Sequence, residues 1–159
     1  RRYGKKAAEA TPPVKKMLDL GIPVGMGSDG TRVSSFNPWI GLYWLSTGKT
    51  VGGTAHTSPQ NLLARQTALR LYTQGSAQLV GLHKDRGMLK AGYLADLCLL
   101  SDDYFQVRDE DILQLESVLT IVDGKVVYGA GVFSHLAPPV PAAIPAWSPV
   151  NFYGGYQKK

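Results

Sequence analysis

The sequence predicts an α/β fold followed by a β-rich segment and an extended tail, and three features support this. A helical pattern over residues 3–20 leads into the short apolar run IPVGMG at 22–27, which is typical of a strand buried on both faces. Two β-branched runs flank Asp123-Gly124, the residue pair that favours a tight hairpin turn. After residue 137 prolines and aromatic residues dominate, which excludes a regular helix or central strand.

Several elements are expected before residue 87. The first helix must break or restart at Pro12-Pro13, and Gly21 is suited to its C-terminal cap. The run NPWIGLYWL predicts a second helix with Pro38 at its first position, where the missing N–H does no harm. A Gly-, Ser- and Thr-rich loop follows over 46–60. Apolar residues at helical spacing over 58–82 then predict two short helices separated by Gly75.

The chain changes character from Gly87 onward. A turn signal at Ala91-Gly92 precedes the β-like run ADLCLL. The acidic stretch 102–116 predicts a loop with a short helical turn, and the hairpin occupies 117–131. The single cysteine, Cys98, excludes an internal disulfide and is expected to be a small buried hydrophobic residue.

Charge and length restrict the class of protein. The 159 residues suffice for one buried core, and 17 basic against 12 acidic side chains give a net charge of +5. The basic pairs lie mostly near the termini, which favours solvated ends over a nucleic-acid surface. No apolar run reaches the roughly 20 residues of a membrane span, and no apolar core follows RRYGKK, so we expect a soluble protein, cytoplasmic or periplasmic.

Asp29 is the most informative polar residue, because it lies where the predicted strand 22–27 ends. Ligands of α/β sheets and barrels bind at the carboxyl ends of strands, where a carboxylate can bind a metal or move a proton. Asp-Gly pairs also begin ordinary turns, so a purely structural role stays open. The sequence has no His-x-His, no paired cysteines, no phosphate-loop spacing and no nucleophile elbow.

Four blocks in order go further than these patterns. They are GIPVGMGSDGTRVSSFNPW, LARQTALRLYTQGSAQLVGL, GMLKAGYLADLCLL and TIVDGKVVYGAG. Together they resemble the carboxyl-terminal end of the metal-dependent amidohydrolase superfamily, in the branch called amidohydrolase family 3. The resemblance implies a (β/α)8 barrel with one or two divalent metal ions, usually zinc, and a small β-sandwich built from both chain ends.

On this resemblance, residues 1–86 are the last strand and helices of the barrel, 87–137 belong to the sandwich, and 138–159 form the tail. The run 22–27 is then the eighth barrel strand. Asp29 is the aspartate that ligates the metal, or that accepts a proton from the hydrolytic water and delivers it to the leaving group.

The departures from the family pattern are equally important. Its other metal ligands are absent, and His56, His83 and His135 all follow the eighth-strand segment, so we interpret them as surface or packing residues. The chain is therefore interpreted as the last portion of a longer hydrolase that cleaves C–N bonds of amides or cyclic amides. Alone it is expected to bind no metal and to be inactive. A non-catalytic β-rich binding or accessory module is the alternative.

Neighbours of Asp29 in the same loop are weaker candidates. Ser28, Arg32 and Asn37 can reach a substrate, but turn and cap roles explain them equally well. The expected partners are a small amide-type substrate and the missing amino-terminal part of the barrel, with no nucleic acid. Without that part, an apolar face is expected to be exposed and to favour self-association; its residues are Leu42, Trp44, Leu45 and Leu69.

Overall fold

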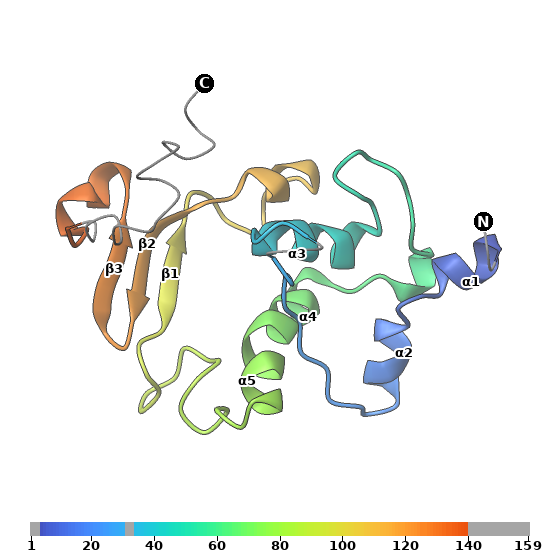
Figure 1. Cartoon of the computed structure of the whole chain (residues 1–159), viewed down its shortest axis with the longest axis horizontal. Coiled ribbons are helices and arrows are strands. Elements are labelled where there is room, and N and C mark those ends of the chain that lie inside the picture. The colour runs from blue at the N-terminus through green and yellow to red at the C-terminus, as the bar shows by residue number, and fades with distance from the viewer. Residues whose placement is uncertain (1–3, 31–33, 140–159) are drawn as a thin grey trace, which may run out of the picture.

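The computed structural model describes residues 4–30 and 34–139, in which a helical part precedes a small antiparallel sheet (Figure 1). The helices are α1 (Lys5–Glu9), α2 (Val14–Asp19), α3 (Pro38–Thr47), α4 (Arg65–Arg70) and α5 (Ser76–Leu79). The strands are β1 (Leu97–Leu100), β2 (Ser117–Val122) and β3 (Lys125–Gly129). Short 3-10 turns occupy Pro59–Asn61, Glu110–Gln114 and Gly131–Leu136. The predicted order of a helical part and a β-rich part is confirmed.

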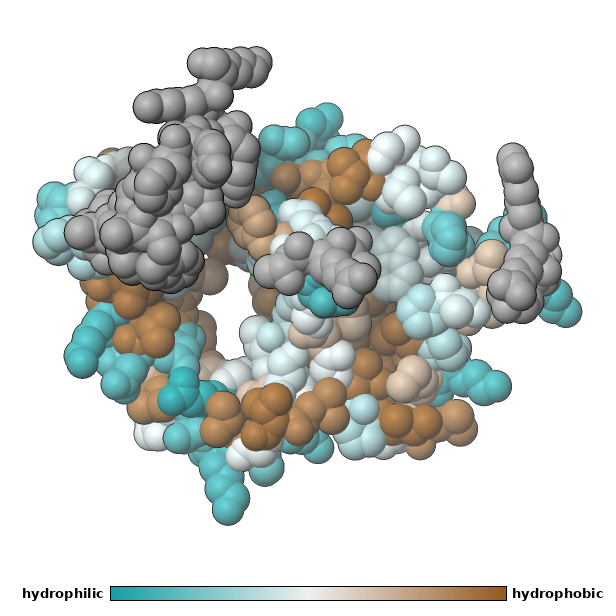
Figure 2. Space-filling view, viewed as in Figure 1, coloured by the Kyte–Doolittle hydropathy of each residue, from teal (hydrophilic) through white to brown (hydrophobic). Residues whose placement is uncertain are grey.

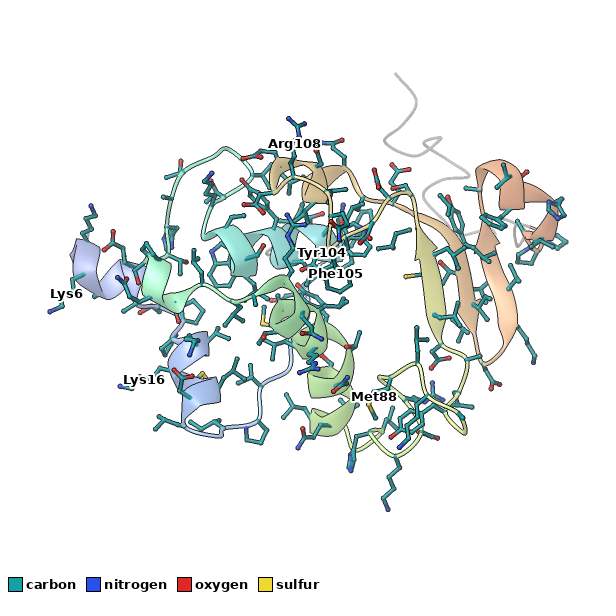
Figure 3. The ribbon with its side chains drawn as sticks, turned by 180° about the vertical axis from the view of Figure 1, so that it is seen from behind. Lys6, Lys16, Met88, Tyr104, Phe105 and Arg108 are labelled. Carbon is teal, nitrogen blue, oxygen red and sulfur yellow. The ribbon has the colours of Figure 1, made fainter. Side chains whose placement is uncertain are left out.

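The first predicted helix is two helices, α1 and α2, separated at Pro12-Pro13 as expected. Gly21 adopts a positive φ of 71° directly after α2, a conformation that favours glycine. Lys6 on α1 and Lys16 on α2 point away from the rest of the molecule (Figure 3). Lys5 and Lys15 pair with Glu9 and Asp19 within their own helices. The basic residues of this region therefore stand on solvated helix faces.

The prediction of a strand at 22–27 was wrong. In the part of the chain that the structure describes, this segment forms no strand. Its backbone is irregular and runs beside α4 and α5, where the Met26 N–H donates to Leu71 O at 3.0 Å. A strand needs a neighbouring strand to pair its N–H and C=O groups. The described residues supply a helix on this side and no pairing strand.

Helix α3 begins at Pro38, as the sequence predicts. The side-chain oxygen of Asn37 accepts a hydrogen bond from Trp39 N at 2.9 Å, Pro38 occupies the first turn, and Gly48 closes the helix with φ 69°. The predicted exposure of an apolar face here was wrong for Leu42 and Leu45, which are 1% and 4% exposed. Neighbours from later in the chain cover both side chains.

Gly75 does not separate two helices, contrary to the prediction. Helix α4 continues through a π-turn, defined by Leu71–Gly75, directly into α5, and Gly75 has ordinary helical dihedrals of −61° and −47°. A Cβ at this position would overlap the carbonyl oxygen of Val24. Glycine is thus required here by the close approach of the 22–27 segment, and the helix runs on through it.

The sheet has the strand order β1-β2-β3 with both pairs antiparallel. Asp123 and Gly124 have φ values of 51° and 73°, as a type I′ turn requires, so the predicted hairpin is confirmed. The prediction for Cys98 was wrong: it is exposed on β1, where it lines an open cavity beside the sheet. Partial burial among apolar neighbours raises the pKa of its thiol.

One core joins the helices to the segment that leads into β2. Buried side chains of α3 and α4 pack with Tyr104, Ile112 and Leu115. Arg65 of α4 donates to the carbonyl oxygen of Tyr104 at 2.6 Å and to Asp109 at 2.7 Å. The Tyr104 hydroxyl donates back to Arg65 O at 3.2 Å. Burial raises the pKa of Tyr104 to about 12, so the phenol keeps its proton and remains a donor.

Apolar surface remains exposed elsewhere, at the end of α5 and in the loop after it. Leu79, Val80 and Leu89 are 58%, 68% and 81% exposed. None of the helices in the described ranges has the length and apolar character that a membrane crossing needs.

We expect the 159-residue chain to bind a hydrophobic dye and to associate in sedimentation experiments, since exposed leucine and valine side chains lose contact with water on association. The double variant Val80→Ser, Leu89→Ser should reduce both effects. Val51→Ser, in a different loop and 61% exposed, is the matched control and should change them little. A monomer that binds no dye would contradict this prediction.

Candidate functional site

Asp29 lies at the end of the segment 22–29, directly before the turn residue Gly30. It is exposed and has a φ of 50°, a left-handed conformation that aspartate tolerates better than most residues. Gly30 is confined next to it, because a Cβ there would overlap Phe36 and lie 2.8 Å from Ser28 Oγ. The local geometry therefore agrees with a turn, and it also directs the chain so that the carboxylate stands at the surface.

Hydrogen bonds to the helix hold the segment that leads to Asp29. The Ser76 hydroxyl donates to Met26 O at 2.7 Å and accepts from Met26 N at 3.2 Å. The same Met26 N–H points to Leu71 O at 3.0 Å, at the start of the π-turn. Met26 is thus fixed through both of its backbone polar groups, three residues before Asp29.

Two glycines allow the segment 22–29 to lie close to the helix: Gly25 is in the segment and Gly75 is in the helix. A Cβ on Gly25 would lie 2.8 Å from Leu79 Cδ1 and 3.0 Å from the Ser76 backbone. A Cβ on Gly75 would overlap Val24 O. The position of Asp29 depends on the absence of side chains at these two positions.

The structure brings two of the other predicted site residues together. Ser28 and Asn37 both line a cavity of about 370 Å³ beside the Asp29 turn. The side-chain oxygen of Asn37 is occupied as the cap of α3, which supports the structural interpretation of that residue. Arg32 lies outside the described residues.

Tyr72 and Lys49 line the same cavity, and neither was predicted as a site residue. Tyr72 comes from the π-turn, and burial raises the pKa of its phenol. The ammonium of Lys49 lies 3.8 Å from Glu110 and is half-exposed, so this ion pair contributes little. A glycine in the middle of a predicted helix, Gly41, was the available sequence signal, because it marks a close approach by another side chain.

The residues described here do not by themselves make a metal centre. No group of three or more histidine, cysteine, aspartate or glutamate side chains comes together within residues 4–30 and 34–139. His56, His83 and His135 are all exposed, as the sequence indicated.

A larger cavity of about 660 Å³ separates α4 and the π-turn from β1. Figure 2 shows the opening between the sheet and the helical part. The walls of this cavity are mainly apolar. They include Met88, from the loop before β1, and Phe105, from the loop after β1, and both residues are labelled in Figure 3. The one carboxylate in this wall, Asp96, is paired with Arg86 at 2.9 Å. Asp29 does not line this cavity. The candidate functional site is therefore the smaller cavity beside Asp29, and not this one.

Comparison with known proteins decides the family. The model of the amidohydrolase family, Amidohydro_3, matches residues 1–128. The chain belongs to this amidohydrolase family. The resemblance inferred from the four sequence blocks is thereby confirmed.

Individual relatives of this chain agree with the match. The N-substituted formamide deformylase of Arthrobacter pascens is 28% identical over 116 residues, which are 73% of this chain and 21% of that protein. The 5-methylthioadenosine/S-adenosylhomocysteine deaminase of Pyrococcus furiosus is 33% identical over 110 residues, 69% of this chain and 24% of that protein. A crystal structure of an amidohydrolase from Thermotoga maritima shares the fold with a TM-score of 0.51 and 17% identity, over 74% of this chain and 26% of that one.

The chain spans only 21% and 24% of the length of the two relatives named above. The matched region includes the Asp29 turn, the π-turn and most of the sheet.

Replacing Gly75 by alanine should destabilise the chain by about 2 kcal/mol, because a Cβ at this position must displace the Val24 carbonyl. Urea unfolding followed by circular dichroism measures the change. Gly27→Ala is the matched control, since a Cβ there meets no atom within 4 Å and its φ is not positive. Equal stability of the two variants would show that the segment does not depend on this contact.

Proposed function

We propose that this chain is the last portion of a longer hydrolase that cleaves C–N bonds other than peptide bonds, in amides or cyclic amides. The observation that carries the proposal is the family match over residues 1–128 together with an exposed aspartate at the end of a segment fixed to the helix. A deformylase and deaminases among the relatives act, by their names, on C–N bonds.

In this proposal Asp29 moves protons. A carboxylate at this position accepts a proton from the water that attacks the substrate carbonyl and returns it to the leaving nitrogen. The fixed Met26 backbone limits how far the carboxylate can move, which favours a repeatable approach to the water. Ser28 precedes Asp29 directly and can contact the substrate from the cavity wall.

A divalent metal, expected to be zinc, belongs to the proposal for the longer protein only. Such an ion would acidify the attacking water, and Asp29 would be one of its ligands. The remaining ligands must come from the absent part, because the described residues of this chain do not fit a complete site.

The proposed division of the chain follows the resemblance. Residues 1–86 complete the carboxyl-terminal end of a (β/α)8 barrel. Residues 87–137 contribute the sheet to a small sandwich, whereas the predicted tail lies outside the described residues after residue 139. A small amide-type substrate and the amino-terminal part of the barrel are the proposed partners.

A non-catalytic accessory module is the second candidate. The three-stranded sheet and the turn geometry of Asp29 favour it, because Asp123 has the same left-handed conformation in a hairpin. The two candidates differ in what the Asp29 carboxylate does. Its replacement by an amide of the same shape therefore distinguishes them.

In the longer protein, Asp29→Asn should lower kcat for an amide substrate by about 10³-fold, since the amide cannot accept the proton. Circular dichroism should show an unchanged fold, because asparagine adopts the left-handed conformation readily. The matched control is Asp123→Asn, also an exposed Asp-Gly position with positive φ, which should leave kcat unchanged. Full turnover by Asp29→Asn would favour the accessory module.

The isolated 159-residue chain should show no amide hydrolysis with or without added zinc, because one carboxylate cannot hold the ion. Hydrolysis assays with an N-substituted formamide, at equal concentrations of the chain and of the longer protein, measure this. Turnover by the isolated chain above that of its Asp29→Asn variant would show that the ligand set has been misidentified.

A further inference from the structure

The cavity beside Asp29 contains a phenol that the proposed proton transfer does not use. Tyr72 lies in the π-turn Leu71–Gly75, between α4 and α5. A π-turn inserts one extra residue into the helix and shifts the side chains around its axis, and such turns are frequent at functional sites. Here the shift places Tyr72 against α3.

Gly41 of α3 makes room for this side chain. A Cβ at position 41 would overlap the Tyr72 hydroxyl and lie 3.0 Å from the ring carbon Cζ. Glycine in a helix interior costs about 1 kcal/mol relative to alanine. The close approach of the phenol is a reason for glycine at this position, and it is independent of the cavity itself.

The remaining walls fit a small organic group. Met26, Ile40 and Trp44 supply apolar surface, whereas Ser28 and Thr50 supply hydroxyl groups. The volume of about 370 Å³ lies within the range of ligand sites in proteins. An aromatic ring with one polar substituent matches this combination of apolar walls and few polar groups.

Tyr72 can act there as a hydrogen-bond donor. Burial raises the pKa of its phenol, so the proton is retained at neutral pH. A donor beside a half-apolar cavity is best satisfied by an acceptor oxygen on the occupant.

We propose that Tyr72 is a specificity-determining residue that donates a hydrogen bond to a carbonyl oxygen on the substituent of an aromatic amide held in this cavity. The inference rests on the proposed function, because it assigns the cavity to the substrate of the same site. The carbonyl bound by Tyr72 is distinct from the one that water attacks.

The test is a binding experiment with two probes of equal size, 4-acetylacetanilide and 4-isopropylacetanilide, of which only the first has the additional carbonyl oxygen. Calorimetry on the longer protein should show tighter binding of 4-acetylacetanilide. Tyr72→Phe should weaken that binding about tenfold, the value of one neutral hydrogen bond, and change the binding of 4-isopropylacetanilide less than twofold.

Tyr93→Phe is the matched control, because it removes a hydroxyl that donates to His83 O at 3.0 Å outside the cavity. It should leave both probes unaffected. Gly41→Ala is a second variant, which should displace the phenol and weaken 4-acetylacetanilide selectively.

An equal effect of Tyr72→Phe on both probes, or no binding of either probe at millimolar concentration, would overturn the assignment. Binding is measured in the Asp29→Asn background of the longer protein, in which the proposed function predicts no hydrolysis of the probes, so the binding result is read separately from turnover. Loss of probe selectivity alongside an inactive Asp29→Asn variant would support both proposals. Unchanged selectivity with an inactive Asp29→Asn variant would overturn the role of Tyr72 alone.

Discussion

The fixation of Met26 to the helix is the contact on which the candidate site depends. The Ser76 hydroxyl bonds to both the N–H and the C=O of Met26, and the π-turn offers Leu71 O to the same N–H. Since buried backbone polar groups need partners, these bonds replace those that a paired strand would otherwise provide. The end of the segment, and with it Asp29, is held in place without any sheet on this side in the described residues.

The connection between the helical part and the sheet depends on a different set of bonds. Arg65 reaches from α4 to the Tyr104 carbonyl and to Asp109, and Tyr104 returns a hydrogen bond to the same helix. Trp39, at the start of α3, packs against the Tyr104 ring with centroids 6.1 Å apart. These contacts secure one end of the sheet, while the large cavity leaves the side of β1 open.

Asp29 and Asp123 show why local geometry alone cannot assign a function. Both are exposed, both precede glycine, and their φ values are 50° and 51°. Asp123 closes a hairpin whose N–H groups bond to Asp96 and Ala95. Asp29 instead follows a segment fixed to a helix and adjoins a cavity through Ser28. The two aspartates differ in the residues that surround them in the folded chain. The turn preferences of the local sequence do not predict those surroundings.

The order of four blocks along the chain indicated the family. The sequence by itself also determined the local features of this protein, which are the break at Pro12-Pro13, the start of α3 at Pro38 and the Asp123-Gly124 hairpin. Each depends on residues close together in the chain, whose backbone preferences act without distant partners. The tertiary structure decided the rest. The segment 22–27 is unpaired, Gly75 continues a helix, Leu42 and Leu45 are buried, Cys98 is exposed, and Tyr72 meets Gly41. Strand pairing, burial and cavity walls depend on which distant residues come into contact, and no local pattern specifies those contacts.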